Sequence, residues 1–297
     1  MINRAVEFTK QHTPNSLRVV ARRAGLEAHN ARMRLFVPVV SRSGYENIYH
    51  CAMQKTASQW IKALFSDPTV YRHSGLLPYV PRYYNYDWRQ LPPFPANRAV
   101  LSLFLSYKRL ESIPKPDRHR AFFVLRDPRD MVVSNYFSTR NSHAPMGDIP
   151  QVRSVLQEKT VKEGMLYLIG HLAKKGTFRA LESWATASKS ETIELFRYED
   201  LTGERQAAEV DRLMRHCGIA IPPAELADLL ARYSFSRMQG GRRSVGSVSH
   251  YRKGKAGDWR NHFDDDIYQA FTAATGNLVE VLGYPARDEP SYTAAND

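Results

Sequence analysis

Short apolar runs alternate along the chain with longer stretches in which apolar residues recur every three to four positions. The apolar runs lie at 47–53, 99–106, 121–125 and 192–198. The helical patterns lie at 16–35, 60–65, 130–139, 151–189, 204–216, 224–232 and 265–282. Runs that are apolar at successive residues are typical of strands buried on both faces. The alternation predicts an α/β fold, in which helices flank both faces of a central, mostly parallel β-sheet.

The N-terminal region differs from the rest in its charge. We predict a basic helical extension over residues 1–45 and a single α/β domain over 46–290. The helix expected at 16–35 is rich in arginine, with Arg18, Arg22, Arg23, Arg32 and Arg34. Two interpretations stay open for it, a peripheral helix packed on the domain or a weak contact with a membrane surface.

Composition narrows the kinds of partner. The 297 residues carry a net charge of +12, which favours an anionic ligand. Basic residues lie in separate turns beside glycine, serine or aromatic residues rather than in one run, so a small anion is favoured over nucleic acid. The two cysteines are too few for a disulfide framework. With no signal peptide and no apolar run of about 20 residues, we expect a cytoplasmic protein.

The turn after the first apolar run combines several anion-binding groups. Its sequence is Gln54-Lys55-Thr56-Ala57-Ser58-Gln59-Trp60, and it leads into the helical run 60–65. The first amides of a helix lack intrahelical partners and bind anions. Lys55 adds a positive charge to them. The order of strand, turn and helix is P-loop-like, but it lacks the glycine and lysine spacing of nucleoside-triphosphate loops.

A second anion site is predicted after the run 121–125. There Asp127 is placed to cap a helix and Pro128 suits its first position. Arg126 would stand at the carboxyl end of the strand, with Ser134 two turns into the helix. Because parallel strands end at one edge of a sheet, both turns should meet there. Two phosphate sites favour a nucleotide phosphorylated at both ends, and Trp60 and Phe235 could sandwich its base.

Together these segments resemble the sulfotransferases that use 3′-phosphoadenosine 5′-phosphosulfate (PAPS). Residues 54–60 are similar to the family's 5′-phosphosulfate loop and 126–134 to its 3′-phosphate motif. Residues 196–201 (Phe-Arg-Tyr-Glu-Asp-Leu) resemble a third segment, and 234–238 the stretch with an adenine-facing phenylalanine. Arg-Lys-Gly at 252–254, followed by Gly-Asp-Trp at 257–259, is close to the C-terminal signature.

The resemblance implies a sulfotransferase domain over 46–290 that moves a sulfuryl group from PAPS to a hydroxyl or amine by in-line attack. Lys55 would stabilise the leaving phosphate. The 5′ phosphate would be bound by Thr56, Ala57, Ser58 and Gln59. The 3′ phosphate would be bound by Arg126, Ser134, Arg252, Lys253 and Gly254. The adenine would lie among Trp60, Tyr198 and Phe235. No metal is implied, and no cluster with metal-ligand spacing is present.

The chain departs from the family at three places, of which the C-terminal dimer motif of some cytosolic members, lost here, lies away from the predicted site and the other two bear on it. Ala57 stands where the loop usually has glycine, which matters if the position needs a positive φ. The segment 103–108 lacks the histidine that serves cytosolic members as general base. We predict His73 in that role, because some sulfotransferases have a glutamate base near this position and imidazole accepts protons near neutral pH. Other candidates are Asp87, Tyr107 and Glu111.

Two other functions stay open on the sequence alone, a P-loop-type kinase and a non-catalytic polyanion-binding protein. A kinase would need magnesium and ATP, and a polyanion binder would show a steep salt dependence. The proline- and aromatic-rich segment 72–95 would form either an acceptor pocket or a satellite core. It leaves an aromatic, lipid-like or sugar acceptor open, so a small molecule, a glycan and a lipid are all possible partners.

Overall fold

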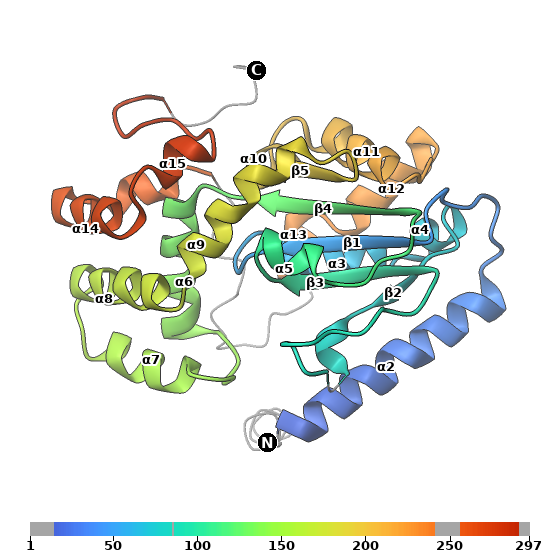
Figure 1. The fold of residues 1–297 in the computed structure, drawn as a ribbon, viewed down its shortest axis with the longest axis horizontal. Helices are drawn as coiled ribbons and strands as arrows, with labels where there is room; N and C mark the ends of the chain where they lie inside the picture. Colours follow the sequence, from blue (N-terminus) through green and yellow to red (C-terminus); the bar gives the residue numbers. More distant parts are fainter. Residues whose placement is uncertain (1–14, 85, 241–255, 291–297) are drawn as a thin grey trace.

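A single sheet of five parallel strands forms the centre of the molecule (Figure 1). The computed structural model describes residues 15–84, 86–240 and 256–290. The strand order is β2-β3-β1-β4-β5. Their bounds are β1 (Asn47–Ala52), β2 (Leu77–Tyr79), β3 (Arg98–Phe104), β4 (His119–Leu125) and β5 (Ile193–Arg197). The predicted α/β architecture is confirmed. Only β2 was missed, because three residues with a central proline show no strand pattern.

Helices cover both faces of the sheet, because successive residues of each strand point to opposite sides. Phe123 of β4 stacks on Trp184 at 4.2 Å between ring centroids, whereas Phe122 stacks on Phe65 at 5.5 Å. The first face is covered by α6 (Pro128–Asn141), α8 (Val161–Lys174), α9 (Thr177–Glu182) and α14 (Asp265–Thr275). The second is covered by α3 (Ser58–Phe65), α11 (Gln206–His216) and α12 (Pro223–Arg232). Both faces of the strands are therefore apolar, as the sequence predicts.

Shorter elements join these layers. They are α4 (Pro68–Arg72), η1 (Pro81–Tyr83), α5 (Tyr107–Glu111), α7 (Ile149–Gln157), η2 (Ser183–Lys189), α10 (Tyr198–Thr202), α13 (Phe235–Gly240), η3 (Asp258–Asn261) and α15 (Leu278–Val281). The single helix predicted over 151–189 is wrong. Thr160 and Glu163 form a capping box that starts α8, and Gly176, with φ 72°, separates α8 from α9. Local caps thus divide one continuous periodic pattern.

The N-terminal helix α2 (Asn15–Phe36) lies along the β2 side of the domain (Figure 1). The Asn30 side chain donates to the Pro78 carbonyl at 3.1 Å, and Met33 packs with Tyr71 and Leu77. These contacts are those of a peripheral helix packed on the domain. No helix in the described part of the chain is long and apolar enough to cross a bilayer.

Candidate functional site

The loop between β1 and α3 turns through two left-handed residues. Lys55 has φ 73° and Ala57 has φ 56° and ψ 18°. Ala57 is the N-cap of α3 and supplies no side-chain hydrogen bond to the helix. The first amides of α3 therefore keep their capacity to bind a ligand, and amides that follow left-handed residues form anion-binding concavities. The position that the family gives to glycine does adopt a positive φ here.

Arg126 connects the two motifs that the sequence singled out. It follows β4, and its Nη1 donates to the Lys55 carbonyl at 2.9 Å. Its guanidinium lies 4.2 Å from the ring centroid of Tyr198, which follows β5. Among the described residues, the buried Nε of Arg126 has no hydrogen-bond partner. An unpaired buried donor is costly, so this nitrogen suits a ligand oxygen.

The surroundings of Lys55 destabilise its positive charge. Burial, and then the nearby charge of Arg126, lower the pKa of its ammonium from 10.5 to about 8. Two cations that repel each other at the floor of one cavity favour an anion between them. This is the electrostatic arrangement that the sequence predicted for a phosphate.

Helix α6 carries the second motif in the predicted way. Asp127 caps it by accepting from the Arg129 amide at 2.9 Å, and Pro128 occupies its first turn. Ser134 lies on the cavity wall. Next to it, the Asn135 amide group donates to the Gln54 side chain at 3.4 Å. The helix after β4 and the loop after β1 are therefore fixed to each other.

A cavity of about 990 Å³ lies at this edge of the sheet. That volume is at the upper end for small-molecule sites. The predicted residues that line it are Lys55, Ala57, Ser58, Gln59, Trp60, Arg126, Ser134 and Tyr198. Thr56 does not line it, because its buried hydroxyl donates to the Met53 carbonyl at 2.9 Å. Only the backbone of Thr56 can therefore serve a ligand in this arrangement.

The structure does not bring His73 to the cavity. His73 follows α4, at the end of α3 opposite the phosphate loop, and an eight-residue helix spans about 12 Å. Its Nε2 lies 3.0 Å from a Glu225 carboxylate oxygen, and the residue is 6% exposed. His73 is therefore not retained as the general base. The error arose because the sequence does not reveal where the chain goes after α3.

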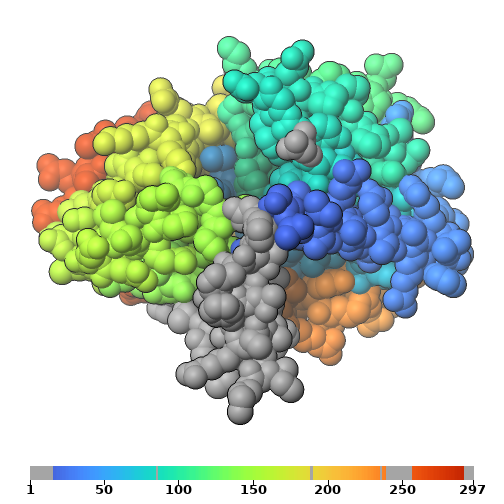
Figure 2. All heavy atoms as spheres, turned by 90° about the horizontal axis from the view of Figure 1, so that it is seen from below, coloured from blue at the N-terminus to red at the C-terminus, as the bar shows by residue number. Residues whose placement is uncertain are grey.

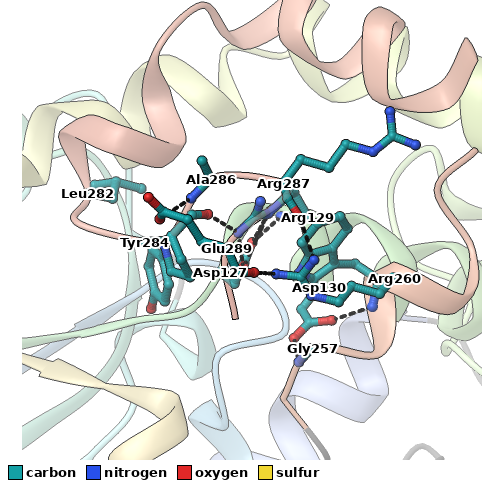
Figure 3. Close-up of polar contacts among 12 residues, drawn as sticks. Asp127, Arg129, Asp130, Gly257, Arg260, Leu282, Tyr284, Ala286, Arg287 and Glu289 are labelled. Carbon is teal, nitrogen blue, oxygen red and sulfur yellow. Dashed lines mark hydrogen bonds and ion pairs between the residues drawn. The ribbon is translucent and has the colours of Figure 1, made fainter. Parts of the chain in front are cut away.

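The remaining predicted residues are only partly described. Phe235 begins α13, but its side chain lies outside what the structure describes, as do Arg252, Lys253 and Gly254 altogether. The first residues that the structure describes after this segment are anchored to α6 (Figure 3). The Asp130 carboxylate accepts from the Gly257 amide at 2.6 Å and from the Trp259 amide at 2.8 Å. The C-terminal signature thus returns to the helix that carries Ser134.

A salt-bridged layer supports this anchor (Figure 3). The fully buried Arg129 binds the Asp127 carboxylate at 2.7 Å and the Pro285 carbonyl at 2.9 Å. Its guanidinium lies 3.9 Å from the Trp259 ring centroid. Beside it, the Glu199 carboxylate accepts from the Asp127 amide and the Tyr284 hydroxyl, and burial raises its pKa to about 7. One network therefore joins β4, β5 and the C-terminal segment beneath the site.

The other half of the cavity uses Tyr83, from the aromatic segment predicted as a possible acceptor pocket, and several residues that the sequence did not single out. Phe104 at the end of β3, Tyr83 of η1 and His143 after α6 line it, together with apolar side chains of α7 and α8. Figure 2 shows the hollow between the segments near 80–110 and those near 140–175. These residues come from separate elements of the chain, and no spacing in the sequence links them.

His143 is the titratable group of interest in this half. Its Nδ1 lies 2.9 Å from the Ala144 carbonyl, which fixes the proton on Nδ1 of the neutral ring. Burial lowers the pKa of the imidazole, and the charges of Lys55 and Arg153 lower it further. His143 is thus a neutral imidazole within the field of Lys55, with its lone pair on Nε2.

The aromatic segment forms mainly a satellite core. Tyr79 stacks on Tyr84 with ring centroids 4.4 Å apart, and Phe94 packs 5.9 Å from both Tyr79 and Tyr86. From this segment, Arg82 and Tyr83 line the cavity. Among the described residues, no group of three or more His, Cys, Asp or Glu is placed to hold a metal ion.

Comparison with known proteins identifies the family to which the chain belongs. The family model described as the sulfotransferase domain matches residues 47–283. Human sulfotransferase 2A1 is 24% identical over 54% of this chain and 58% of its own. The 3-alpha-hydroxysteroid sulfotransferase of Cavia porcellus is 24% identical over 62% of this chain and 65% of its own. The chain thus spans about three fifths of the length of these curated relatives. The crystal structure of mouse sulfotransferase SULT7A1 complexed with PAP shares the fold, with a TM-score of 0.54, 17% identity and coverage of 85% and 88%.

Proposed function

Because the chain belongs to the sulfotransferase family, we propose that it transfers a sulfuryl group from PAPS to a hydroxyl of a small-molecule acceptor. The observation that carries the proposal is the hydrogen bond from Arg126 to the Lys55 carbonyl. It holds Arg126, the residue proposed to bind the 3′ phosphate, next to the loop proposed to bind the phosphosulfate, in one cavity. Relatives named for hydroxysteroids support a small hydroxyl compound as the acceptor.

The donor lies on the β4 and β5 side of the phosphate loop in this proposal. The amides of Ala57, Ser58 and Gln59 bind the 5′ phosphate. Arg126 and Ser134 bind the 3′ phosphate with the help of Arg252, Lys253 and Gly254, and the adenine lies near Trp60, Tyr198 and Phe235. The unpaired Nε of Arg126 supports this assignment.

The transfer itself needs one leaving group and one proton acceptor. The acceptor oxygen attacks sulfur in line, a new O–S bond forms, and the bond from sulfur to the bridging oxygen breaks. The electron pair leaves with that oxygen, on the phosphate of 3′,5′-adenosine bisphosphate. The Lys55 ammonium stabilises the charge that develops there, and fixed charge of this kind is a large part of catalysis.

His143 replaces His73 as the general base of this proposal. Its lowered pKa keeps it unprotonated at neutral pH, so that Nε2 can take the hydroxyl proton. The same cavity holds Lys55, and the pKa of His143 responds to the charge of Lys55.

A cytoplasmic location of the protein stays a prediction.

The test is transfer of radiolabelled sulfate from PAPS to a panel of hydroxysteroids, simple phenols and hydroxy acids. We expect labelled product and adenosine bisphosphate in equal amounts, without added magnesium. ATP with magnesium serves as the control for the kinase alternative. Failure to release adenosine bisphosphate above the level of Lys55→Ala with every acceptor would contradict the proposal.

A further inference from the structure

Three cations gather on the wall of the cavity beside β3. Arg22 comes from α2, Lys62 from α3 and Arg82 from η1, and all three line the cavity. The N-terminal helix contributes because α2 packs against η1. Segments far apart in sequence thus place positive charge at one part of the wall.

Lys62 and Arg82 are partly buried and have aromatic neighbours, whereas Arg22 is exposed on α2. The Lys62 ammonium donates to the Tyr83 hydroxyl at 3.4 Å. The Arg82 guanidinium lies 5.7 Å from the Tyr83 ring centroid and 5.9 Å from that of Phe104. Within the described ranges, the buried Nε of Arg82 has no hydrogen-bond partner, and none of the three cations forms an ion pair with a carboxylate.

The opposite wall provides a contrast. Lys175 and His171 also line the cavity, but Asp148 pairs with them at 2.6 and 2.9 Å. Charge is therefore neutralised on the wall made by α7 and α8 and left unneutralised on the wall made by α2, α3 and η1. The two walls of the cavity therefore differ in whether their cations are paired with carboxylates.

The cluster changes the titration of its own members. Burial lowers the pKa of the Lys62 ammonium, and the charges of Arg82 and Arg22 lower it further, against the opposing effect of Tyr83. Burial would raise the pKa of the Tyr83 phenol, yet the charges of Lys62 and Arg82 bring it below its usual value. The potential at this wall is positive, which favours a bound anion.

The donor does not account for this second positive region. In the sheet order β2-β3-β1-β4-β5, Arg126 and Tyr198 follow strands on one side of β1. Phe104 ends β3 on the other side, and the Arg82 guanidinium lies 5.9 Å from its ring centroid. A nucleotide bound by Arg126 therefore directs its phosphosulfate, not its base or 3′ phosphate, toward this half.

We propose that the acceptor itself carries an oxyanion, such as a carboxylate, which Arg22, Lys62 and Arg82 bind. This inference rests on the proposed function and names the class of its substrate. The apolar body of the acceptor packs against Phe104, Tyr83 and the apolar side chains of α7 and α8. The anion and the reacting hydroxyl then lie at different ends of the molecule.

The test uses acceptors in pairs that differ only in charge. One pair is para-hydroxyphenylpropionate and its amide, and the other is an ω-hydroxy fatty acid and its amide. Calorimetry of each compound with protein saturated with adenosine bisphosphate measures acceptor binding without turnover. We expect at least one acid to bind about tenfold more tightly than its amide, as for hydrogen bonds to charged groups.

Variants locate the effect. Arg82→Gln and Arg22→Gln should each reduce the acid-to-amide ratio severalfold and leave binding of the amide unchanged. Lys175→Gln is the matched control, because that lysine lines the cavity but is already paired with Asp148. Equal affinity of acid and amide in both pairs, no binding of either acid, or a ratio that neither arginine variant changes overturns the inference. Weak binding of adenosine bisphosphate by the wild type would instead contradict the proposed function.

Discussion

The cavity has a half proposed for the donor and a half proposed for the acceptor, and the two are formed by different kinds of segments. Within the described residues, the proposed donor half is formed mainly by contiguous motifs at the ends of β1, β4 and β5, each with its functional residues within nine positions. The acceptor half combines α2, η1, the end of β3 and the loop after α6, which lie more than a hundred residues apart at the extremes. Local geometry therefore explains the first half, whereas tertiary packing is needed to explain the second.

This difference corresponds to a difference in chemistry. A phosphate needs amides at a helix start and a nearby cation, which a short segment can supply. An acceptor pocket needs a shaped wall, which only packed elements from several segments supply. Changes in the donor half should abolish transfer with every acceptor, whereas changes in the acceptor half should depend on the acceptor used.

The largest effect is expected at Lys55, where the halves meet. Lys55→Ala should lower kcat about a thousandfold, since fixed charges aimed at a developing anion contribute that much. The control Lys175→Ala should keep near-normal kcat. Because the pKa of Lys55 is about 8, the affinity of the wild type for adenosine bisphosphate should fall as pH rises through that value. An affinity independent of pH from 7 to about 9 would remove the assigned role.

The second prediction concerns Glu199, in the buried network beneath the donor half. Its pKa is raised by burial, so ionisation costs stability in the folded state. The protonated carboxyl contributes fully to the free energy of unfolding below its unfolded-state pKa of about 4.5. This contribution is lost as the pH rises through the folded-state pKa of about 7. Glu199→Gln can still accept from the Asp127 amide, and its amide nitrogen can donate to the Tyr284 oxygen in place of the bond it loses. It should remove up to about 3 kcal/mol of this dependence. Urea unfolding at pH 5 and pH 8 measures it, and parallel behaviour of both proteins would refute the assignment.

General-base catalysis is tested in the acceptor half. His143→Asn should lower kcat about a hundredfold. The wild-type rate should fall on the acid side, at a pH below the usual imidazole pKa, because burial lowers the pKa of His143. The variant should lack that limb and bind adenosine bisphosphate normally. His73→Asn is the control and should leave the rate and its pH profile unchanged. Retention of the acid limb in His143→Asn would exclude it as the base.

The smallest effect is expected at Ala57, in the loop itself. A left-handed φ of 56° is costly for alanine but not for glycine, so Ala57→Gly should stabilise the protein by about 1 kcal/mol. The matched control Ala63→Gly, inside α3, should destabilise it by about 1 kcal/mol. Thermal unfolding measures both. A loss of stability in Ala57→Gly would show that the alanine methyl group has another role.

The residues proposed to bind the donor could be grouped from the sequence for a physical reason. Strand ends, caps and helix starts are local, so Lys55, Arg126 and Tyr198 could be assigned to one edge of the sheet before the structure was known. His73 was misplaced because only the path of the chain after α3 reveals that α4 lies at the other end. His143 and Arg82 have no motif around them. They became candidates only once the packing of α2, η1 and α6 showed that they line the same cavity as Lys55.

The central claim is that Arg126 and Lys55 bind one nucleotide with phosphates at both ends. Calorimetry with adenosine bisphosphate and AMP, on the wild type and Arg126→Ala, tests it most directly. The wild type should bind the bisphosphate about a hundredfold more tightly than AMP, as for charge-assisted hydrogen bonds to a second phosphate. Arg126→Ala should lose most of that preference while its affinity for AMP stays nearly the same. Equal binding of the two nucleotides by the wild type would contradict the account.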